Sequence, residues 1–199
     1  MQDVHKTPAV AATARKTRDL DTDLLIIPVF DDDTLGDEAD LDRASGGEYA
    51  AARKRGEFTG KLYEQLVTPV GGDSWKSRRA LWVGAGPRRE ITTERIRRIA
   101  TIGGLFARQR RLTSIAILCR AIEGITLDRA VQALAEGAVL ANYEGTTYKT
   151  SGTPVAWLER VELRAPGEVD ATVVERGRVL GEATNMARAL SNEPGNVLT

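Results

Sequence analysis

The chain has 199 residues, in which 28 Lys and Arg balance 28 Asp and Glu, so its formal net charge is zero. Hydrophobic residues make up 42% and charged residues 28%, a composition typical of one globular domain. Neither a run of about 20 apolar residues, as a membrane helix needs, nor the apolar core of a secretory signal is present. One cysteine, Cys119, and one histidine, His5, exclude an internal disulfide, a zinc site with several His or Cys ligands, and any Ser-His-Asp triad without His5.

Residues 1–22 are small and polar and show no sustained periodicity, so we expect a flexible leader. A continuous apolar run over 24–30 predicts a strand covered on both faces, in which Pro28 indicates an edge position or a bulge. An acidic loop at 31–33 and a turn at 35–37 follow. We expect a helix over 48–55, closed by Gly56, and strands over 63–70 and 79–83.

The second half alternates helices and strands. The spacing predicts a helix over about 92–111 that begins at Thr92 or Thr93, a buried strand over 114–119, and a helix over 127–141 capped by Thr126. A polar turn over 143–153 leads to a strand near 160–164. A helix over about 169–191 ends before Pro194, with its inner face at Val173, Gly177, Leu180, Ala187 and Leu190. This alternation indicates an α/β fold, a three-layer sandwich with a mixed, largely parallel sheet.

Gly84-Ala85-Gly86 lies between a predicted strand and a predicted helix, where glycines can bring backbone N–H groups close to a phosphate. The third glycine of the dinucleotide fingerprint would fall at Arg89, Pro87 removes a donor, and no phosphate-loop Lys-Ser/Thr pair follows. A plain turn is therefore the favoured interpretation.

Residues 88–111 carry eight arginines against Glu90 and Glu94, which could match nucleic-acid phosphates. They are Arg88, Arg89, Arg95, Arg97, Arg98, Arg108, Arg110 and Arg111. No aromatic residues alternate with them for base stacking, and they occupy positions that the apolar stripe leaves free. We favour a solvated amphipathic helix whose charge is compensated by the acidic stretch Asp31, Asp32, Asp33, Asp37, Glu38 and Asp40.

The remaining candidates favour structural roles. Asp31-Asp32-Asp33 lacks the register of a calcium loop and is expected to be an exposed loop. Cys119 is expected to be a buried thiol, His5 to be free in solvent, and Ser45 to have no catalytic partner. Trp75, Trp82 and Trp157 are expected to pack. The residue pattern thus assigns no catalytic, cofactor-binding or metal-binding residue.

The last segment, residues 185–199, closely resembles the junction of the leucyl (cytosol) aminopeptidase family, where an Asn-x-Ala-Arg-x-Leu-x-Asn-x-Pro-x-Asn-x-Leu-Thr run joins two domains. Earlier segments resemble that family in the same order. They are Ala44-Ser45-Gly46-Gly47, Lys54 to Lys61, Arg79 to Gly86, Ala133 to Gly137, and Tyr148-Lys149-Thr150. The resemblance runs from about Asp23 to Thr199.

The resemblance implies a macro-domain-like N-terminal domain over 23–191 and, at 192–199, the start of a junction to a catalytic domain that this sequence does not include. Family members are homohexameric, cytoplasmic exopeptidases with two divalent metal ions, zinc or manganese, bound by segments after the junction. We therefore expect this chain to be inactive alone and to serve assembly and active-site access. The alternatives are an ADP-ribose-binding or other phosphate-binding macro-like module, and nucleic-acid binding through residues 88–111. The implied partners are the catalytic domain and sister subunits, not a membrane.

Overall fold

Six strands form one sheet in a computed structural model that describes residues 4–33, 39–72, 74–145 and 156–193. The strands are β1 (Ala9–Thr13), β2 (Leu24–Phe30), β3 (Gln65–Pro69), β4 (Arg79–Gly86), β5 (Ser114–Leu118) and β6 (Arg160–Arg164). Their spatial order is β1-β6-β5-β2-β4-β3. Only β3 runs antiparallel to its neighbour, so the expectation of a mixed, largely parallel sheet is confirmed.

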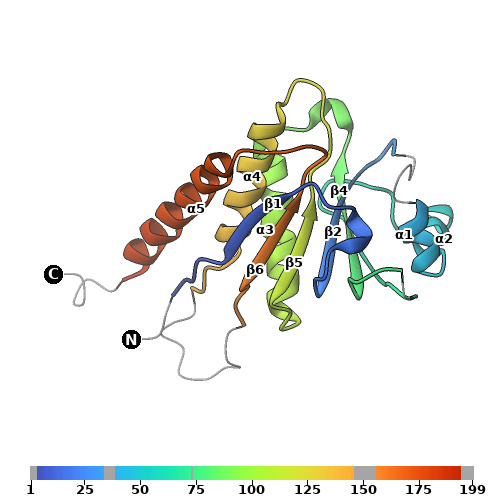
Figure 1. The fold of residues 1–199 in the computed structure, drawn as a ribbon, viewed down its shortest axis with the longest axis horizontal. Coiled ribbons are helices and arrows are strands. Elements are labelled where there is room, and N and C mark those ends of the chain that lie inside the picture. Colours follow the sequence, from blue (N-terminus) through green and yellow to red (C-terminus); the bar gives the residue numbers. More distant parts are fainter. Residues whose placement is uncertain (1–3, 34–38, 73, 146–155, 194–199) are drawn as a thin grey trace.

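Helices cover the sheet on both sides (Figure 1). The helices are α1 (Ala39–Ala44), α2 (Glu48–Arg55), α3 (Thr93–Gln109), α4 (Leu127–Leu140) and α5 (Ala171–Asn192), with 3-10 turns at Thr17–Asp19 and Arg88–Glu90. One core lies between the sheet and α3, α4 and α5, and a second between the sheet and α1 and α2. The three-layer α/β fold is therefore confirmed, although α1 was not expected.

The predicted helix starts hold in detail. The Thr92 hydroxyl accepts a hydrogen bond from the backbone N–H of Arg95, and the Thr126 hydroxyl accepts one from Arg129. These caps satisfy N–H groups that would otherwise lack partners in the first turn. Gly56, with φ of 74°, ends α2 as expected.

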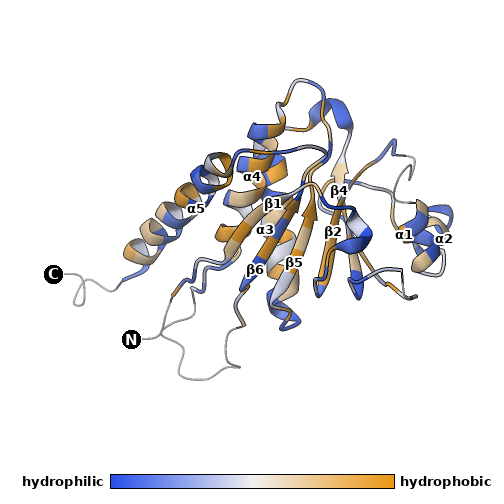
Figure 2. Ribbon diagram, in the orientation of Figure 1, coloured by the Kyte–Doolittle hydropathy of each residue, from blue (hydrophilic) through white to orange (hydrophobic). Residues whose placement is uncertain are grey.

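Strand β2 is buried along its whole length because it serves both cores. Leu24 and Ile26 face the core under α3 and α4, whereas Leu25 and Ile27 face the core under α1 and α2. Figure 2 shows hydrophobic colours along the central strands. The edge position that Pro28 suggested is wrong, because β2 lies between β5 and β4. A bulge is observed one residue beyond Pro28, where the register with β4 shifts between Val29 and Phe30.

The expectation of a flexible leader over 1–22 is wrong for the described residues. Ala9–Thr13 forms β1, which pairs in parallel with β6 at the edge of the sheet. Leu20 is fully buried in the second core. The short Ala-Val-Ala-Ala-Thr sequence carries a weak strand pattern, and pairing with β6 together with the packing of Val10 and Ala12 on the first core places it in the sheet. The expected turn at 35–37, most of the 143–153 turn and almost all of 192–199 lie outside the described residues.

Helix α5 packs on α4 through small residues. A Cβ atom at Gly177 would lie 2.4 Å from the Gln132 carbonyl oxygen, and one at Gly181 would lie 2.9 Å from that of Glu136. The two backbones therefore approach more closely than any larger residue permits. The inner face is formed by Val174, Gly177, Gly181 and Asn185. The expectation that Leu180, Ala187 and Leu190 face inward is wrong, because all three are exposed.

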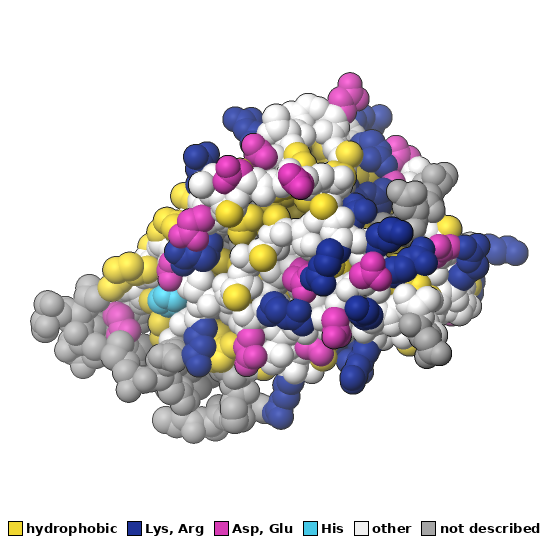
Figure 3. All heavy atoms as spheres, in the orientation of Figure 1, with side chains coloured by type: hydrophobic (Ala, Val, Ile, Leu, Met, Phe, Trp, Pro, Cys, Tyr) yellow, Lys and Arg dark blue, Asp and Glu magenta, His cyan; other side chains and the backbone are white. Residues whose placement is uncertain are grey.

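The surface carries charged side chains of both signs, interspersed over the visible face (Figure 3). Within the described ranges, no helix has the length and apolar character required to cross a membrane.

Candidate functional site

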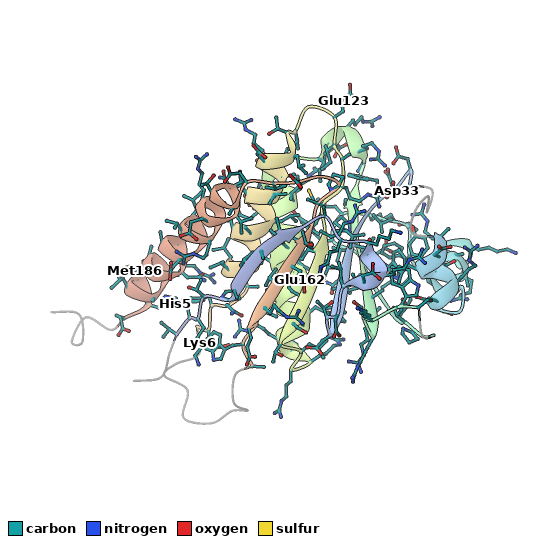
Figure 4. The ribbon with its side chains drawn as sticks, in the orientation of Figure 1. His5, Lys6, Asp33, Glu123, Glu162 and Met186 are labelled. Atoms are coloured by element: carbon teal, nitrogen blue, oxygen red, sulfur yellow. The ribbon has the colours of Figure 1, made fainter. Side chains whose placement is uncertain are left out.

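The strongest candidate for a site is a crevice at the carboxyl ends of the parallel strands. The chain passes from β4, on one side of β2, to β5 on the other, and ligands of open α/β sheets bind where the strand order reverses in this way. The crevice has a volume of about 630 Å³ and is lined by Asp31, Asp32, Pro87, Arg88, Arg89, Ile91, Glu123 and Gly124. Figure 4 shows Asp33 and Glu123 at this edge.

Asp33 organises the charges beside this crevice. Its side chain is 7% exposed and accepts hydrogen bonds from Arg88 at 2.6 Å and Arg120 at 3.0 Å. The backbone N–H of Phe30 donates to the same carboxylate at 3.1 Å. The guanidinium of Arg88 also lies 4.0 Å from the centroid of the Phe30 ring and 3.5 Å from Asp32. Arg88 and Arg120 are therefore already engaged within the protein.

This arrangement was only partly predictable. The sequence singled out Asp33 and Arg88 separately, but it did not single out Arg120. Its position in the chain could have identified Arg120. It comes two residues after the end of β5, so it lies at the same edge of the sheet as the end of β2. Asp31 and Asp32 are exposed as expected, whereas Asp33 is not.

Cys119 lies in an apolar cavity of about 20 Å³ beside these residues, lined also by Phe30, Ile91 and Ile96. The thiol is buried, and burial raises its pKa to about 11. A thiol rather than a thiolate is therefore present near neutral pH, and a thiol is a poor nucleophile and a poor metal ligand. The expected structural role of Cys119 is confirmed.

Gly84-Ala85-Gly86 forms the end of strand β4, so the expected turn there is wrong, and its glycines serve chain packing. The backbone N–H of Gly84 donates to the Glu64 carbonyl at 2.8 Å, and that of Gly86 donates to the Gly60 carbonyl at 3.0 Å. A Cβ atom at Gly84 would lie 1.8 Å from the Lys61 carbonyl oxygen, so only glycine fits. Because both N–H groups are occupied, neither can donate to a phosphate without breaking this contact.

Most arginines of residues 88–111 are paired or buried. Arg98 pairs with Glu94 at 2.7 Å, Arg97 with Glu136 at 2.9 Å, and Arg95 with Glu90 at 3.2 Å. The acidic residues come mainly from the helices themselves, and among the described residues of 31–40 the expected compensation is seen at Arg88, which pairs with Asp32 and Asp33. The segment therefore does not present an open row of cations.

Arg108 is a buried structural residue. Its guanidinium donates to the main-chain carbonyls of Ala141, Tyr143 and Ala156, and pairs with Glu144 at 3.1 Å. Burial lowers its pKa, and Glu144 opposes that effect. Arg108 thus joins α3 to the chain on either side of residues 146–155.

Ser45 and Trp82 belong to one buried hydrogen-bonded chain. Trp82 Nε1 donates to Thr68 Oγ1 at 3.1 Å, Thr68 donates to Ser45 Oγ at 3.1 Å, and Ser45 donates to the Leu41 carbonyl at 2.9 Å. The expected packing of Trp82 is confirmed, and the buried Ser45 hydroxyl donates its hydrogen bond to the main chain. Trp75 and Trp157 are half-buried, the former against the second core and the latter 4.8 Å from the Arg108 guanidinium.

His5 is not free in solvent. It is half-buried and forms an isolated backbone bridge with Tyr143. In the described part of the chain, no three His, Cys, Asp or Glu side chains lie close enough together to hold a metal ion. The resemblance implies a two-metal centre held by segments after the junction, and the described residues form no such centre of their own.

Polar residues of the junction motif attach α5 to the segment that ends α4. Asn185 is fully buried and donates to the Val139 carbonyl at 2.8 Å. The Arg188 guanidinium lies 3.9 Å from the Tyr143 ring centroid, and Tyr143 donates to the Arg188 carbonyl at 3.2 Å. Asn192 donates to the Tyr143 hydroxyl. The described motif residues thus fix the end of α5.

Residues 26–152, more than half of the chain, match the model of the N-terminal domain of the cytosol aminopeptidase family. The chain belongs to this family. A probable cytosol aminopeptidase of Geotalea uraniireducens is 34% identical over 170 residues, which cover 80% of this chain and 33% of the relative. The chain spans about a third of the length of the curated cytosol aminopeptidases that it matches.

Solved structures agree with this placement in fold. A tomato leucine aminopeptidase mutant has a TM-score of 0.79 at 19% identity, covering 100% of this chain and 41% of that one. The bottromycin maturation enzyme BotP, in complex with Mn, has a TM-score of 0.67 at 22% identity, covering 89% and 33%. An Oceanobacillus iheyensis macrodomain mutant with ADPR has a TM-score of 0.58 at 12% identity, covering 96% and 97%. The expected macro-domain-like fold is confirmed.

Proposed function

We propose that this chain is the non-catalytic N-terminal domain of a cytosol aminopeptidase and that it serves assembly of the enzyme and access to its active sites. One observation carries the proposal: the chain matches the family's N-terminal domain and spans about a third of the length of the curated relatives. In this proposal, residues 23–191 form the domain together with β1 and Leu20, which precede them in the chain and pack into it, and residues 192–199 begin the junction to a catalytic domain in the parent protein.

The chemistry of the parent would lie in that second domain. The described residues of this chain offer no group for a metal ion, so two divalent ions, zinc or manganese, would be held by residues after the junction. When bound, such ions activate water for attack on the peptide carbonyl. The proposed parent is a cytoplasmic homohexamer that removes N-terminal amino acids from peptides.

Activity measurements on two proteins test this proposal. The parent protein should release p-nitroaniline from Leu-p-nitroanilide with Zn²⁺, Mn²⁺ or Mg²⁺, whereas the 199-residue chain should release none. The parent treated with a chelator is the matched control. Metal-dependent turnover by the pure 199-residue chain would contradict the proposal, as would a parent that is inactive with all three metals.

A second candidate is binding of ADP-ribose or another phosphate ligand in the crevice. It is supported by the position of the crevice at the strand switch and by Arg89, which forms no ion pair with another described residue. The engagement of Arg88 and Arg120 with Asp33 weakens it. Calorimetry with ADP-ribose tests this candidate. Heat of binding is expected for the wild-type chain and should be lost in Arg89→Ala. No heat at millimolar ligand would remove this candidate.

A further inference from the structure

The outer side of α5 carries an exposed apolar row, which we define as Val179, Ala183, Met186 and Leu190. Val179 is 47% exposed, Met186 57% and Leu190 48%, and the adjacent Leu180 is 42% exposed. Of the six large exposed hydrophobic side chains in the described ranges, these four lie on α5. Figure 4 labels Met186 near the outer end of this helix, and Figure 3 shows hydrophobic side chains there. Exposed apolar side chains concentrated on one helix indicate an interface.

The row is a second apolar face of α5, separate from the face that packs on the domain core. The opposite side of α5 is already packed on α4 through Gly177, Gly181 and Asn185. Steps of four, three and four residues place the outer row along one side of the helix, as in a seam that packs against another helix. Helix α5 therefore has two packing faces, of which this domain uses one.

The polar residues at the end of α5 support the interpretation of the row as an interface. Asn185, Arg188 and Asn192 make contacts to residues 139–143, so polar groups are used for internal attachment. Met186 and Leu190, which lie between them in sequence, point outward. A solvent-facing helix surface normally has the reverse arrangement, with apolar groups inside and polar groups outside. Apolar residues in this position suit a surface that another part of a protein covers.

We propose that the outer row of α5 is the docking surface for the remainder of the parent polypeptide, an inference that rests on the proposed function. Helix α5 carries the first residues of the junction motif and ends within it at Asn192, so the polypeptide that continues from it is tethered next to the row. A tether supplies an effective concentration of about millimolar and permits a small interface to form. The row exposes roughly a few hundred Å², below the approximately 800 Å² per partner of a stable interface between free proteins.

The charges beside the row favour an apolar occupant. Arg178 pairs with Glu175 at 2.7 Å and with Glu182 at 2.6 Å, and the exposed Arg176 on the same helix balances the second glutamate. No excess of one sign is left there to recruit an acidic or basic partner. The occupant is therefore an apolar helix face or apolar surface of the second domain.

Oxidation of Met186 by hydrogen peroxide, followed by mass spectrometry, measures directly whether the outer row is covered, because sulfoxide formation requires access to the sulfur. We expect Met186 to oxidise at least fivefold more slowly in the parent protein than in the 199-residue chain, with added N-acetylmethionine amide calibrating the oxidant. Equal rates in the two proteins would overturn the proposal. Protection in the 199-residue chain that grows with its concentration would also overturn it and would identify a second copy as the occupant.

A pair of variants tests the same surface in another way. Met186→Glu should leave the melting temperature of the 199-residue chain unchanged but should lower that of the parent and speed its cleavage by trypsin. Leu105→Glu on α3, 40% exposed in the domain, is the matched control and should change neither protein. An unchanged parent with Met186→Glu would contradict the docking surface even if the parent is an active aminopeptidase. An inactive parent that still protects Met186 would contradict only the proposed function.

Discussion

The side-chain amide of Asn185 on α5 donates a hydrogen bond of 2.8 Å to the main-chain carbonyl oxygen of Val139 on α4. Asn185 is fully buried, and its own carbonyl oxygen accepts a hydrogen bond from Arg188 at 3.2 Å. Asn185, the first residue of the junction motif, thus anchors α5 to α4 inside the domain. It fixes the direction in which α5 leads out of the domain and which side of α5 faces outward.

Asn185→Asp should destabilise the domain because it replaces a buried donor by a charged acceptor of the same size. The new carboxylate would face the Val139 carbonyl oxygen, and we expect a loss of about 2–4 kcal/mol in the free energy of unfolding at pH 7. Urea unfolding measures the loss. Thr184→Asp, at an exposed position of the same helix, is the control and should cost much less. Equal losses in the two variants would show that Asn185 has no special role.

Arg108→Ala should be far more damaging than removal of an exposed arginine from the same helix. It leaves the buried carbonyl of Ala141 and the partly buried carbonyls of Tyr143 and Ala156 without their donor, so we expect a loss of about 3–5 kcal/mol. Arg98→Ala should cost far less, because Arg98 forms a solvent-exposed pair with Glu94. Thermal unfolding of both variants checks the difference. Similar melting temperatures would contradict the burial of Arg108.

Cys119 should react slowly with thiol reagents in the folded protein. A pKa of about 11 leaves about one thiol in a thousand ionised at pH 8, and burial restricts access as well. Titration with Ellman's reagent should therefore detect almost no thiol in native buffer and one per chain in 6 M guanidinium. Rapid reaction of one equivalent in native buffer would contradict this prediction.

Asp23 should make stability depend on acid pH. One carboxylate oxygen accepts hydrogen bonds from the backbone N–H groups of Thr113 and Ser114 and from the Ser114 hydroxyl. Partial burial acts to raise its pKa, but these hydrogen bonds and the charge of Arg78 outweigh it and hold the pKa of Asp23 below its usual value. The ionised form is thus favoured in the folded state.

A group with a lowered folded-state pKa contributes stability above its unfolded pKa, about 3.9, and loses it as the pH falls through the folded value. The stability difference between the wild type and Asp23→Asn should therefore be largest near pH 7 and should shrink below about pH 4. Urea unfolding at pH 7, 5 and 3 measures it. A difference independent of pH would contradict the role of the carboxylate.

Several elements were predictable because their signals are local. The apolar run of β2 showed burial on both faces, and the caps Thr92 and Thr126 placed the starts of α3 and α4. The role of Cys119 followed from its place in an apolar strand pattern. Such features depend on residues a few positions apart, so the chain itself contains the information.

The candidate crevice was less predictable because its parts come from separate strands. Asp33 follows β2, Arg88 follows β4 and Arg120 follows β5, and only the strand order brings them together. The Gly84-Ala85-Gly86 segment, which ends β4, resembled a phosphate-binding loop because its pattern alone does not show which groups pair with its backbone. Its N–H groups are taken by Glu64 and Gly60, a contact that no local spacing announces.

The sequence by itself determined the alternation of strands and helices, the helix starts and the family, because apolar periodicity, caps and the junction motif are written along the chain. Only the tertiary structure decided that Ala9–Thr13 is a strand, that Arg108 is buried and that Leu180 and Leu190 face outward. Periodicity reports that a helix has apolar sides, but not which side is used. Gly177 and Gly181 settle that choice, because their missing side chains let α4 approach on one side alone.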